Sequence, residues 1–251
     1  MTRARVSFIP EVGERALIVG QTGSGKTAFA TWLLERIPTS PIVIYDTKEE
    51  EKFPMLPRSV VVHSQRACDE ALHDLSIDFV ILRPPVEQQG EPEILDAYLW
   101  HHYQNYKGIV AYIDEGQTFH KGGRAYKGLI ALMARGRSRG ITTILSTQRP
   151  VSISRSIISE AQKVYAFKLG DRRDRKILSE VVPNFDKIPL PPKHGFYFFE
   201  SGQDAPTLFA PITLPAKYNS GYVDATVSDH GPKDGEHSPD VQGPLTKHIW
   251  I

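Results

Sequence analysis

The sequence lacks several features that would each point to a class of protein. Cys68 is the only cysteine among 251 residues, which excludes an internal disulfide and predicts a reducing compartment. The 30 basic and 29 acidic residues leave a net charge of +1, so no global field favours nucleic acid or an anionic membrane. No run of about 18 apolar residues is present, so we expect no direct insertion into a membrane. Any binding to DNA must therefore depend on local clusters of charge.

Short apolar runs alternate with stretches of helical spacing up to about residue 190. This alternation predicts an α/β fold in which helices cover a mostly parallel sheet. A single domain over residues 1–215 is long enough to bury a substantial core. The expected strands are 16–19, 42–46, 59–63, 78–82, 109–113, 141–146 and 163–168.

The C-terminal part of the chain has a different composition. Two apolar runs flank a turn rich in Gly and Asp, which predicts an appended β-hairpin over 195–212. Residues 216–251 are rich in Gly, Pro, Asp and His and have little periodicity. We expect this second region to be a tail that is flexible or ordered only by a partner.

The most informative motif is a glycine-rich loop that follows the predicted strand 16–19 and matches G-x-x-x-x-G-K-[ST]. Its glycines let successive backbone N–H groups point at phosphate oxygens, and the start of the next helix adds a favourable dipole. Lys26 then reaches the β- and γ-phosphates, while the Thr27 hydroxyl is a ligand of Mg²⁺. The motif predicts a nucleoside triphosphate site built from Gly20, Gln21, Thr22, Gly23, Ser24, Gly25, Lys26, Thr27 and Ala28.

Two adjacent carboxylates, Asp114 and Glu115, end the apolar run 109–113. An Asp at the carboxyl end of a buried strand can complete the shell of Mg²⁺. A neighbouring Glu can orient and deprotonate the attacking water. A nucleotide kinase does not need a water-activating glutamate here, whereas a hydrolysing motor does, so the pair favours an ATPase.

The β-branched run 141–146 predicts another buried strand, and it continues into Thr147 and Gln148. Ligands of parallel sheets bind at the carboxyl ends of the strands. A glutamine there can hydrogen-bond both the γ-phosphate and the lytic water. We therefore expect Gln148 to report whether the phosphate is present; a polar strand end that only caps the fold is the alternative.

Three arginines, Arg135, Arg137 and Arg139, stand at every second position before the strand 141–146. Arginine suits contact with a transferring phosphate, and an arginine supplied by another subunit raises the rate by about 10³–10⁵ in related enzymes. A cluster so far from the P-loop suggests a subunit that completes its neighbour's site. A solvated face is the alternative for one or two of them.

The combination of these motifs resembles the FtsK–HerA superfamily of DNA-pumping ATPases. The resemblance rests on GQTGSGKT, on IVAYIDEGQ, and on a GR-x-x-G-I segment followed by STQRP. Residues 46–48, Asp-Thr-Lys, also resemble the segment that follows the second strand in these motors. The match covers about residues 14–180. In its small size the chain is most similar to the genome-packaging ATPases of tailless icosahedral DNA viruses with internal membranes.

The resemblance implies a RecA-like (ASCE) P-loop NTPase fold and a role for each motif. ATP and Mg²⁺ would be bound by Lys26 and Thr27, with Asp114 as the acidic residue of the metal shell. Glu115 would be the catalytic base and Gln148 the γ-phosphate sensor. Arg137 matches the arginine finger that acts in trans, with Arg135 and Arg139 as close competitors.

The resemblance also implies a function and partners. We expect a homo-oligomeric ring, a hexamer as the superfamily resemblance implies, that moves double-stranded DNA into a preformed capsid. Capsid-vertex or portal proteins would be its partners. It would work in the cytoplasm of the host cell, with the packaging vertex of the virion as a further location.

Three alternatives stay open at this point. One is a cellular HerA-like or conjugative DNA translocase, which has the same motifs and additional domains. Another is an ATPase for the assembly or export of filamentous phage, a class that normally carries a transmembrane segment. The third is a nucleotide-gated scaffold with little turnover, which would not need Glu115, Gln148 and the arginines.

The segment 120–128 is the candidate for DNA contact, because it is basic and glycine-rich and carries one aromatic residue. A mobile basic loop suits contact with backbone phosphates that does not read the base sequence. An ordinary solvated connection is the alternative.

Overall fold

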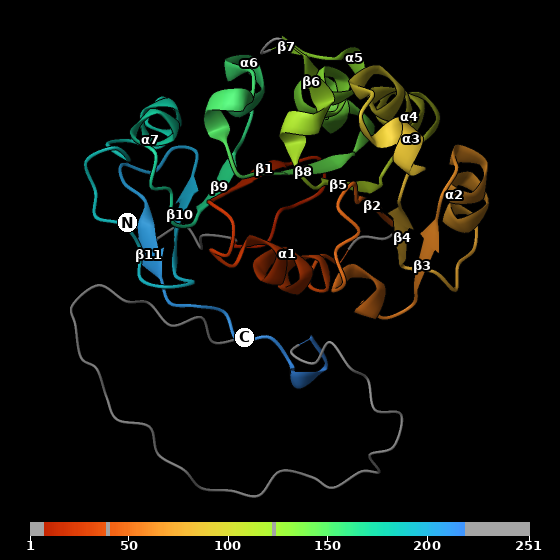
Figure 1. Cartoon of the computed structure of the whole chain (residues 1–251), viewed down its shortest axis with the longest axis horizontal. Helices are drawn as coiled ribbons and strands as arrows, with labels where there is room; N and C mark the ends of the chain where they lie inside the picture. Colours follow the sequence, from red (N-terminus) through yellow and green to blue (C-terminus); the bar gives the residue numbers. More distant parts are fainter. Residues whose placement is uncertain (1–7, 39–40, 122–123, 219–251) are drawn as a thin grey trace, which may run out of the picture.

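Apolar side chains line both sides of the central strands, so both faces of the sheet must be covered by other elements. In the first strand, Ala16 and Ile18 belong to one buried cluster and Leu17 and Val19 to the other. This division follows from the alternation of side chains along a strand. The computed structural model describes residues 8–38, 41–121 and 124–218. There, helices cover both faces of one large sheet (Figure 1).

Nine strands form the main sheet, in the order β11-β10-β9-β1-β8-β5-β2-β4-β3. The strands from β9 to β3 in this order pair in parallel, and β10 pairs antiparallel with both β9 and β11. All seven predicted strands are confirmed, with ends that differ by at most two residues. The strands of this sheet are β1 (Arg15–Val19), β2 (Ile42–Tyr45), β3 (Ser59–Val62), β4 (Phe79–Leu82), β5 (Val110–Ile113), β8 (Thr142–Thr147), β9 (Lys163–Ala166), β10 (Phe196–Glu200) and β11 (Thr207–Phe209).

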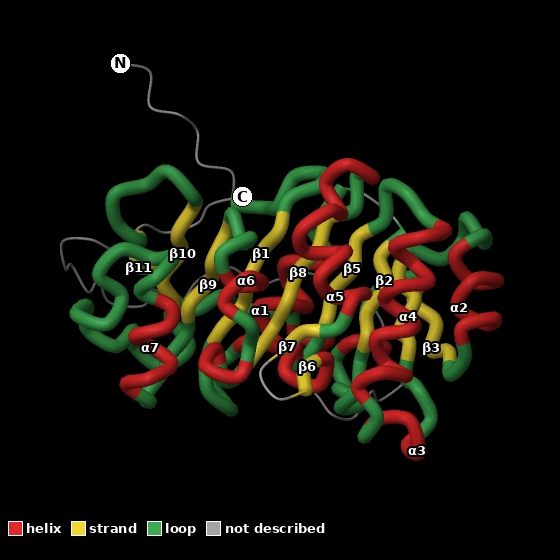
Figure 2. Tube along the Cα trace, turned by 90° about the horizontal axis from the view of Figure 1, so that it is seen from above, coloured by secondary structure: helices red, strands yellow, loops and turns green. Residues whose placement is uncertain are grey.

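The helix α1 lies on one face of the sheet, and α4, α5 and α6 lie on the other, as the two views show (Figures 1 and 2). The helices are α1 (Lys26–Leu34), α2 (Gln65–Leu72), α3 (Val86–Gln89), α4 (Pro92–Asn105), α5 (Lys127–Ile130), α6 (Arg155–Ile158) and α7 (Arg172–Leu178). A π-helical turn (Ala131–Arg135) and a 3-10 turn (Gly136–Arg139) continue α5. Other 3-10 turns are Phe53–Met55, Gly116–Phe119, Pro150–Ser152 and Ala216–Tyr218, and a small second sheet pairs β6 (His120–Lys121) with β7 (Arg124–Ala125).

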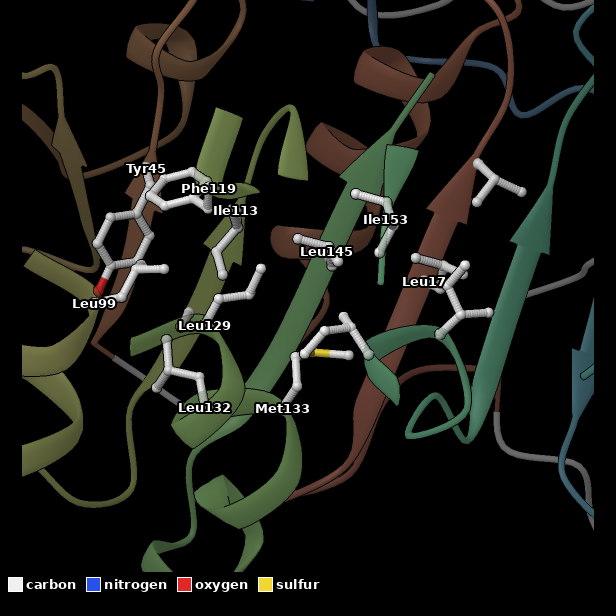
Figure 3. Packing of buried hydrophobic residues seen from close by; sticks show 14 of the residues in the cluster. Leu17, Tyr45, Leu99, Ile113, Phe119, Leu129, Leu132, Met133, Leu145 and Ile153 are labelled. Atoms are coloured by element: carbon white, nitrogen blue, oxygen red, sulfur yellow. The ribbon is translucent and has the colours of Figure 1, made fainter. Parts of the chain in front are cut away.

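The core has an aliphatic half and an aromatic half. On the face of α4 and α5, Leu99, Leu129 and Leu132 pack against Ile113 and Leu145 of the sheet (Figure 3). Burial of each side chain of this size stabilises the folded state by about 1.5–3 kcal/mol relative to leaving it exposed. On the face of α1, rings of the helix and of β9 and β10 pack together, among them Phe29, Tyr165, Phe196 and Phe198.

The predicted C-terminal hairpin is confirmed, since Tyr197 of β10 pairs with Leu208 of β11. It is not an appendage, however, because β10 also pairs with β9 and so extends the main sheet. The folded part reaches beyond the predicted boundary at residue 215. Tyr218 is buried, and its hydroxyl donates to Glu35 Oε1 at 2.7 Å. The rest of the predicted tail, 219–251, lies outside the described residues.

Candidate nucleotide-binding and hydrolysis site

The predicted motifs meet at one edge of the sheet. The strands β1, β8, β5 and β2 are parallel neighbours, so the segments that follow them leave the sheet at the same edge. These segments are the P-loop (residues 20–27), Gln148, the pair Asp114 and Glu115, and residues 46–48. The strand β8 lies between the P-loop strand and the acidic strand.

The P-loop is attached to the sheet and curls above it. Its first residues bond to the neighbouring strand ends: Gly20 N donates to Thr147 O at 3.3 Å, and Gln21 N to Lys168 O at 2.9 Å. Gly25 has φ +105° and sits at the N-cap of α1, a backbone conformation that L side chains rarely adopt. Ser24 Oγ is buried without a hydrogen-bond partner among the described residues. An anion over this helix N-terminus would supply such a partner.

Lys26 and Thr27 are the first residues of α1. Lys26 is buried, and Nζ donates to Gln21 O at 3.4 Å. Burial lowers the pKa of Lys26, and the charges of Glu115 and Asp114 oppose this shift. The Thr27 hydroxyl donates to Glu50 Oε1 at 3.4 Å. A phosphate would therefore meet one desolvated ammonium and one hydroxyl here.

Asp114 is a buried carboxylate that accepts a hydrogen bond from Tyr112 at 3.0 Å and pairs with no basic side chain among the described residues. Burial and the neighbouring charge of Glu115 raise the pKa of Asp114 to about 7. A divalent cation beside Thr27 would stabilise its charged form. In the described part of the chain, no three His, Cys, Asp or Glu residues form a metal cage. Mg²⁺ commonly combines one or two carboxylates with water and substrate phosphates, and Asp114 with Thr27 could supply the protein ligands of such a site.

Glu115 lies at the centre of a hydrogen-bonded cluster. It is buried, with a left-handed backbone at φ +56°. Its Oε1 contacts Lys48 Nζ and Gln148 Nε2, and its Oε2 contacts Gln117 Nε2. Burial alone raises the pKa of Glu115, but the bonds from Lys48 and Gln148 outweigh it, so the pKa lies below its ordinary value. The carboxylate is thus held in its charged form.

Gln148 connects this cluster to the P-loop, because its Oε1 accepts a hydrogen bond from Thr22. The amide therefore bridges a P-loop hydroxyl and the Glu115 carboxylate. A phosphate or water that entered between these groups would change both bonds. This geometry is compatible with the predicted sensor role.

The three arginines lie away from this site. They precede β8, so they stand at its amino end, six residues or roughly 20 Å from the edge that holds the P-loop. Arg139 donates to the backbone carbonyls of Gln104 and Tyr106, whereas Arg135 and Arg137 are exposed. In this arrangement the cluster does not contact the P-loop of its own chain.

Residues 46–48 contribute to the site, although the sequence motifs did not predict a chemical role for them. Asp46 is fully buried and bonds to Arg83, and Lys48 contacts the carboxylate of Glu115. Glu50 and Gln117 are further neighbours. The available signal was the polar Asp-Thr-Lys segment directly after an apolar strand, which is the position of a ligand-facing loop.

An apolar hollow of about 230 Å³ opens beside the P-loop. It reaches the start of α1 at Gly25 and Ala28, and the ring of Phe167 and the side chain of His194 face it. Pro211, Ile212 and Leu214, which follow β11, form part of the wall. Its place and apolar lining suit a flat aromatic base attached to phosphates on the P-loop.

A P-loop, a separate acidic strand and a glutamine-bearing strand between them define a P-loop NTPase. The chain belongs to the AAA domain family, whose model matches residues 14–152. The predicted class, a P-loop ATPase with a mostly parallel sheet, is confirmed. Within the described residues, no helix has both the length and the apolar character needed to cross a membrane.

Relatives and solved structures agree with this class. The chain is 28% identical over 184 residues to the DNA packaging ATPase P9 of Enterobacteria phage PRD1, covering 70% of this chain and 73% of the relative. Its fold is similar to the genome packaging NTPase B204 of Sulfolobus turreted icosahedral virus 2 in complex with AMPPCP. That match has a TM-score of 0.63 and 18% identity, and covers 80% of this chain and 98% of the other. The pCW3 conjugation coupling protein TcpA, in its monomer form, gives a TM-score of 0.50 and 17% identity, with 78% and 59% covered.

Proposed function

We propose that this chain hydrolyses ATP to drive double-stranded DNA into a preformed viral capsid, as one subunit of a homo-oligomeric ring. The observation that carries the proposal is the convergence of Glu115 and Gln148 on the P-loop, which a pure nucleotide switch would not need. The similarity to a phage DNA packaging ATPase over most of both chains supports the packaging role. A conjugative translocase is the second candidate, supported by the weaker fold similarity to a coupling protein.

The chemistry follows from the arrangement of the side chains. The backbone of the P-loop and Lys26 bind the phosphates, and the adenine ring of ATP occupies the hollow beside Ala28. Thr27 and Asp114 would hold Mg²⁺, which neutralises charge on the phosphates when bound. Glu115 accepts a proton from the attacking water, and Gln148 orients that water toward the γ-phosphate. Because the site is buried around Glu115, these interactions act in a medium of low dielectric.

The ring and its surroundings belong to the same proposal. A hexamer of this chain would enclose the DNA and work with capsid-vertex or portal proteins in the cytoplasm of the host cell. Exposed arginines at the edge opposite the P-loop fit a role toward an adjacent subunit. Residues 219–251 of the predicted tail are a candidate contact with a partner.

The decisive experiment measures ATP turnover with and without duplex DNA. We expect duplex DNA to raise turnover several-fold and Lys26→Ala to abolish it, because the phosphates lose their ammonium partner. Nuclease protection of DNA inside preformed capsids then separates packaging from conjugative transfer. Turnover that is absent, or that ignores duplex DNA, would contradict the proposal.

The segment 120–128, which includes β6, β7 and the start of α5, is the proposed DNA contact. Lys121 pairs with Glu93 at 3.4 Å, and Lys127 lies over the ring of Trp100 at 4.8 Å. Exposed interactions of this kind are weak, so both side chains can exchange their partners for phosphates. Replacing Lys121, Arg124 and Lys127 by Ala should weaken duplex binding for all sequences. It should also reduce the salt slope by roughly one unit per lost phosphate contact.

A matched control removes three exposed basic residues of α7, namely Arg172, Arg173 and Lys176. This variant carries the same change in net charge and should keep the salt slope of the parent. If both triple variants bind duplex DNA as tightly as the parent does, the segment 120–128 is an ordinary surface connection.

A further inference from the structure

The segment 46–48 lies against the predicted catalytic base, and the proposed mechanism does not use it. The strands β2 and β5 pair in parallel, with Tyr45 opposite Ile113. The backbone N–H of Asp114 donates to Tyr45 O at 3.2 Å just beyond the paired residues. The turn that follows β2 is therefore held beside the residues that follow β5, which brings Lys48 to Glu115.

A buried carboxylate fixes the shape of this turn. Asp46 Oδ1 accepts from the backbone N–H of Lys48 at 3.3 Å and of Glu50 at 3.2 Å. Its Oδ2 pairs with Arg83 Nε at 2.9 Å, and Arg83 also donates to Glu50 O at 2.8 Å. The backbone of the turn is thus anchored from both sides. The Lys48 side chain, which is 42% exposed, is the solvent-facing part of this anchored turn.

The contacts of Glu115 leave little room for a water. Lys48 and Gln148 share one carboxylate oxygen, and Gln117 takes the other. A base engaged in this way cannot readily accept a proton from an attacking water. One of these donors must move before Glu115 can act, and the exposed lysine is the donor with most freedom.

The same lysine lies near the phosphate-binding ammonium. The charge of Lys48 is one of those that lower the pKa of Lys26, behind burial and against the nearby carboxylates. Both ammonium groups thus interact electrostatically with the charge of Glu115, Lys26 from the P-loop at longer range and Lys48 from the turn after β2 by direct contact. A γ-phosphate bound by Lys26 would compete with Glu115 for the second ammonium.

We propose that Lys48 is a second phosphate-binding lysine, which pairs with Glu115 in the absence of ATP and transfers to the γ-phosphate when ATP binds. The transfer frees the Glu115 carboxylate for the water only when a γ-phosphate is present. Lys48 is a positioning residue for the base and a ligand of the phosphate. The inference rests on the proposed ATPase function and adds the means by which the site distinguishes ATP from ADP.

The test compares the affinities of Lys48→Met for ADP and for a non-hydrolysable ATP analogue, measured by calorimetry with Mg²⁺. We expect the analogue to bind about tenfold more weakly than to the parent, while ADP binding stays within twofold, because only the analogue carries a γ-phosphate. Lys48→Arg should recover most of the lost affinity. Lys107→Met, an exposed lysine before β5 at the opposite edge, is the matched control and should change neither affinity.

A second background separates the two partners of Lys48. In the Glu115→Gln background, residue 115 carries no charge. Adding Lys48→Met there should still weaken binding of the ATP analogue and leave binding of ADP unchanged. Equal losses for ADP and the analogue, or no loss for either, would overturn the proposal. These measurements need neither hydrolysis nor DNA, so their failure is distinct from a failure of the DNA-stimulated turnover experiment.

Discussion

At the scale of single residues, the backbone of Glu115 is unusual. A glutamate at φ +56° is strained by about 1–2 kcal/mol, which the surrounding contacts must offset. This conformation turns its side chain to the point where Lys48, Gln117 and Gln148 converge. Strain at such a position is typical of groups held for chemistry rather than for packing.

Glu115→Gln should keep ATP binding and lower turnover by about 10²–10⁴-fold, because the amide cannot accept the proton of the water. Lys26 and Thr27 are untouched, so the affinity for ATP should stay near that of the parent. Single-turnover hydrolysis and nucleotide titration measure the two effects separately. Glu49→Gln, an exposed neighbour on the turn after β2, is the control. Near-parental turnover in Glu115→Gln would remove this residue from the mechanism.

At the scale of elements, α5 is fixed to α4 by an unusually close contact. Asp96 is buried on α4, and its carboxylate accepts from the backbone N–H groups of Gly128 at 2.7 Å and Leu129 at 2.8 Å. A Cβ at Gly128 would lie 2.5 Å from Asp96 O and 2.7 Å from Trp100 N. The small residue thus lets two helix backbones approach and places the π-helical turn that leads to the arginines.

Gly128→Ala should therefore lower the free energy of unfolding by about 1–3 kcal/mol, since the obstructing atoms are backbone and cannot rotate away. Urea denaturation measures this change. Gly90→Ala is the matched control, because nothing lies within 4 Å of its Cβ and its φ is −85°. A Gly128→Ala protein as stable as the Gly90→Ala protein would show that α4 and α5 separate at little cost.

At the scale of the whole molecule, the P-loop and the exposed arginines lie at opposite edges of one sheet. This separation prevents Arg137 from reaching the phosphates of its own chain, while leaving it accessible to a neighbour. Arg139 is committed to carbonyls of the α4–β5 connection, which favours Arg135 or Arg137 as the arginine acting in trans. A ring would give both edges a function at each subunit interface.

Arg137→Ala should leave nucleotide affinity nearly intact and lower turnover steeply. Mixing Arg137→Ala with Lys26→Ala subunits should restore part of the activity, because one kind of interface pairs an intact P-loop with an intact arginine. Arg135→Ala serves as the comparison: if Arg135 is only a solvated surface residue, this change should alter turnover only a few-fold. A monomer with full turnover would contradict this prediction. Mixed rings without recovery, under conditions of proven subunit exchange, would weigh against it less strongly.

Local pattern alone determined much of this protein. The seven parallel strands, the P-loop and the pair Asp114 and Glu115 are readable from the sequence, because strand periodicity and glycine-rich turns depend on residues close together in the chain. The C-terminal hairpin was readable for the same reason. The roles assigned to Gln148 and Arg137 stay predictions, although the structure brings the glutamine to the P-loop.

Only the tertiary structure decided which strands are neighbours. Pairing of β2 with β5 places Lys48 on Glu115, and pairing of β10 with β9 makes the hairpin part of the main sheet. The direction of β8 puts the arginines at the edge opposite the P-loop. Such contacts join segments far apart in the chain, and nearly continuous apolar strands carry no local mark of their partners. Their order is decided by packing helices on both faces of one sheet, which is a property of the whole chain.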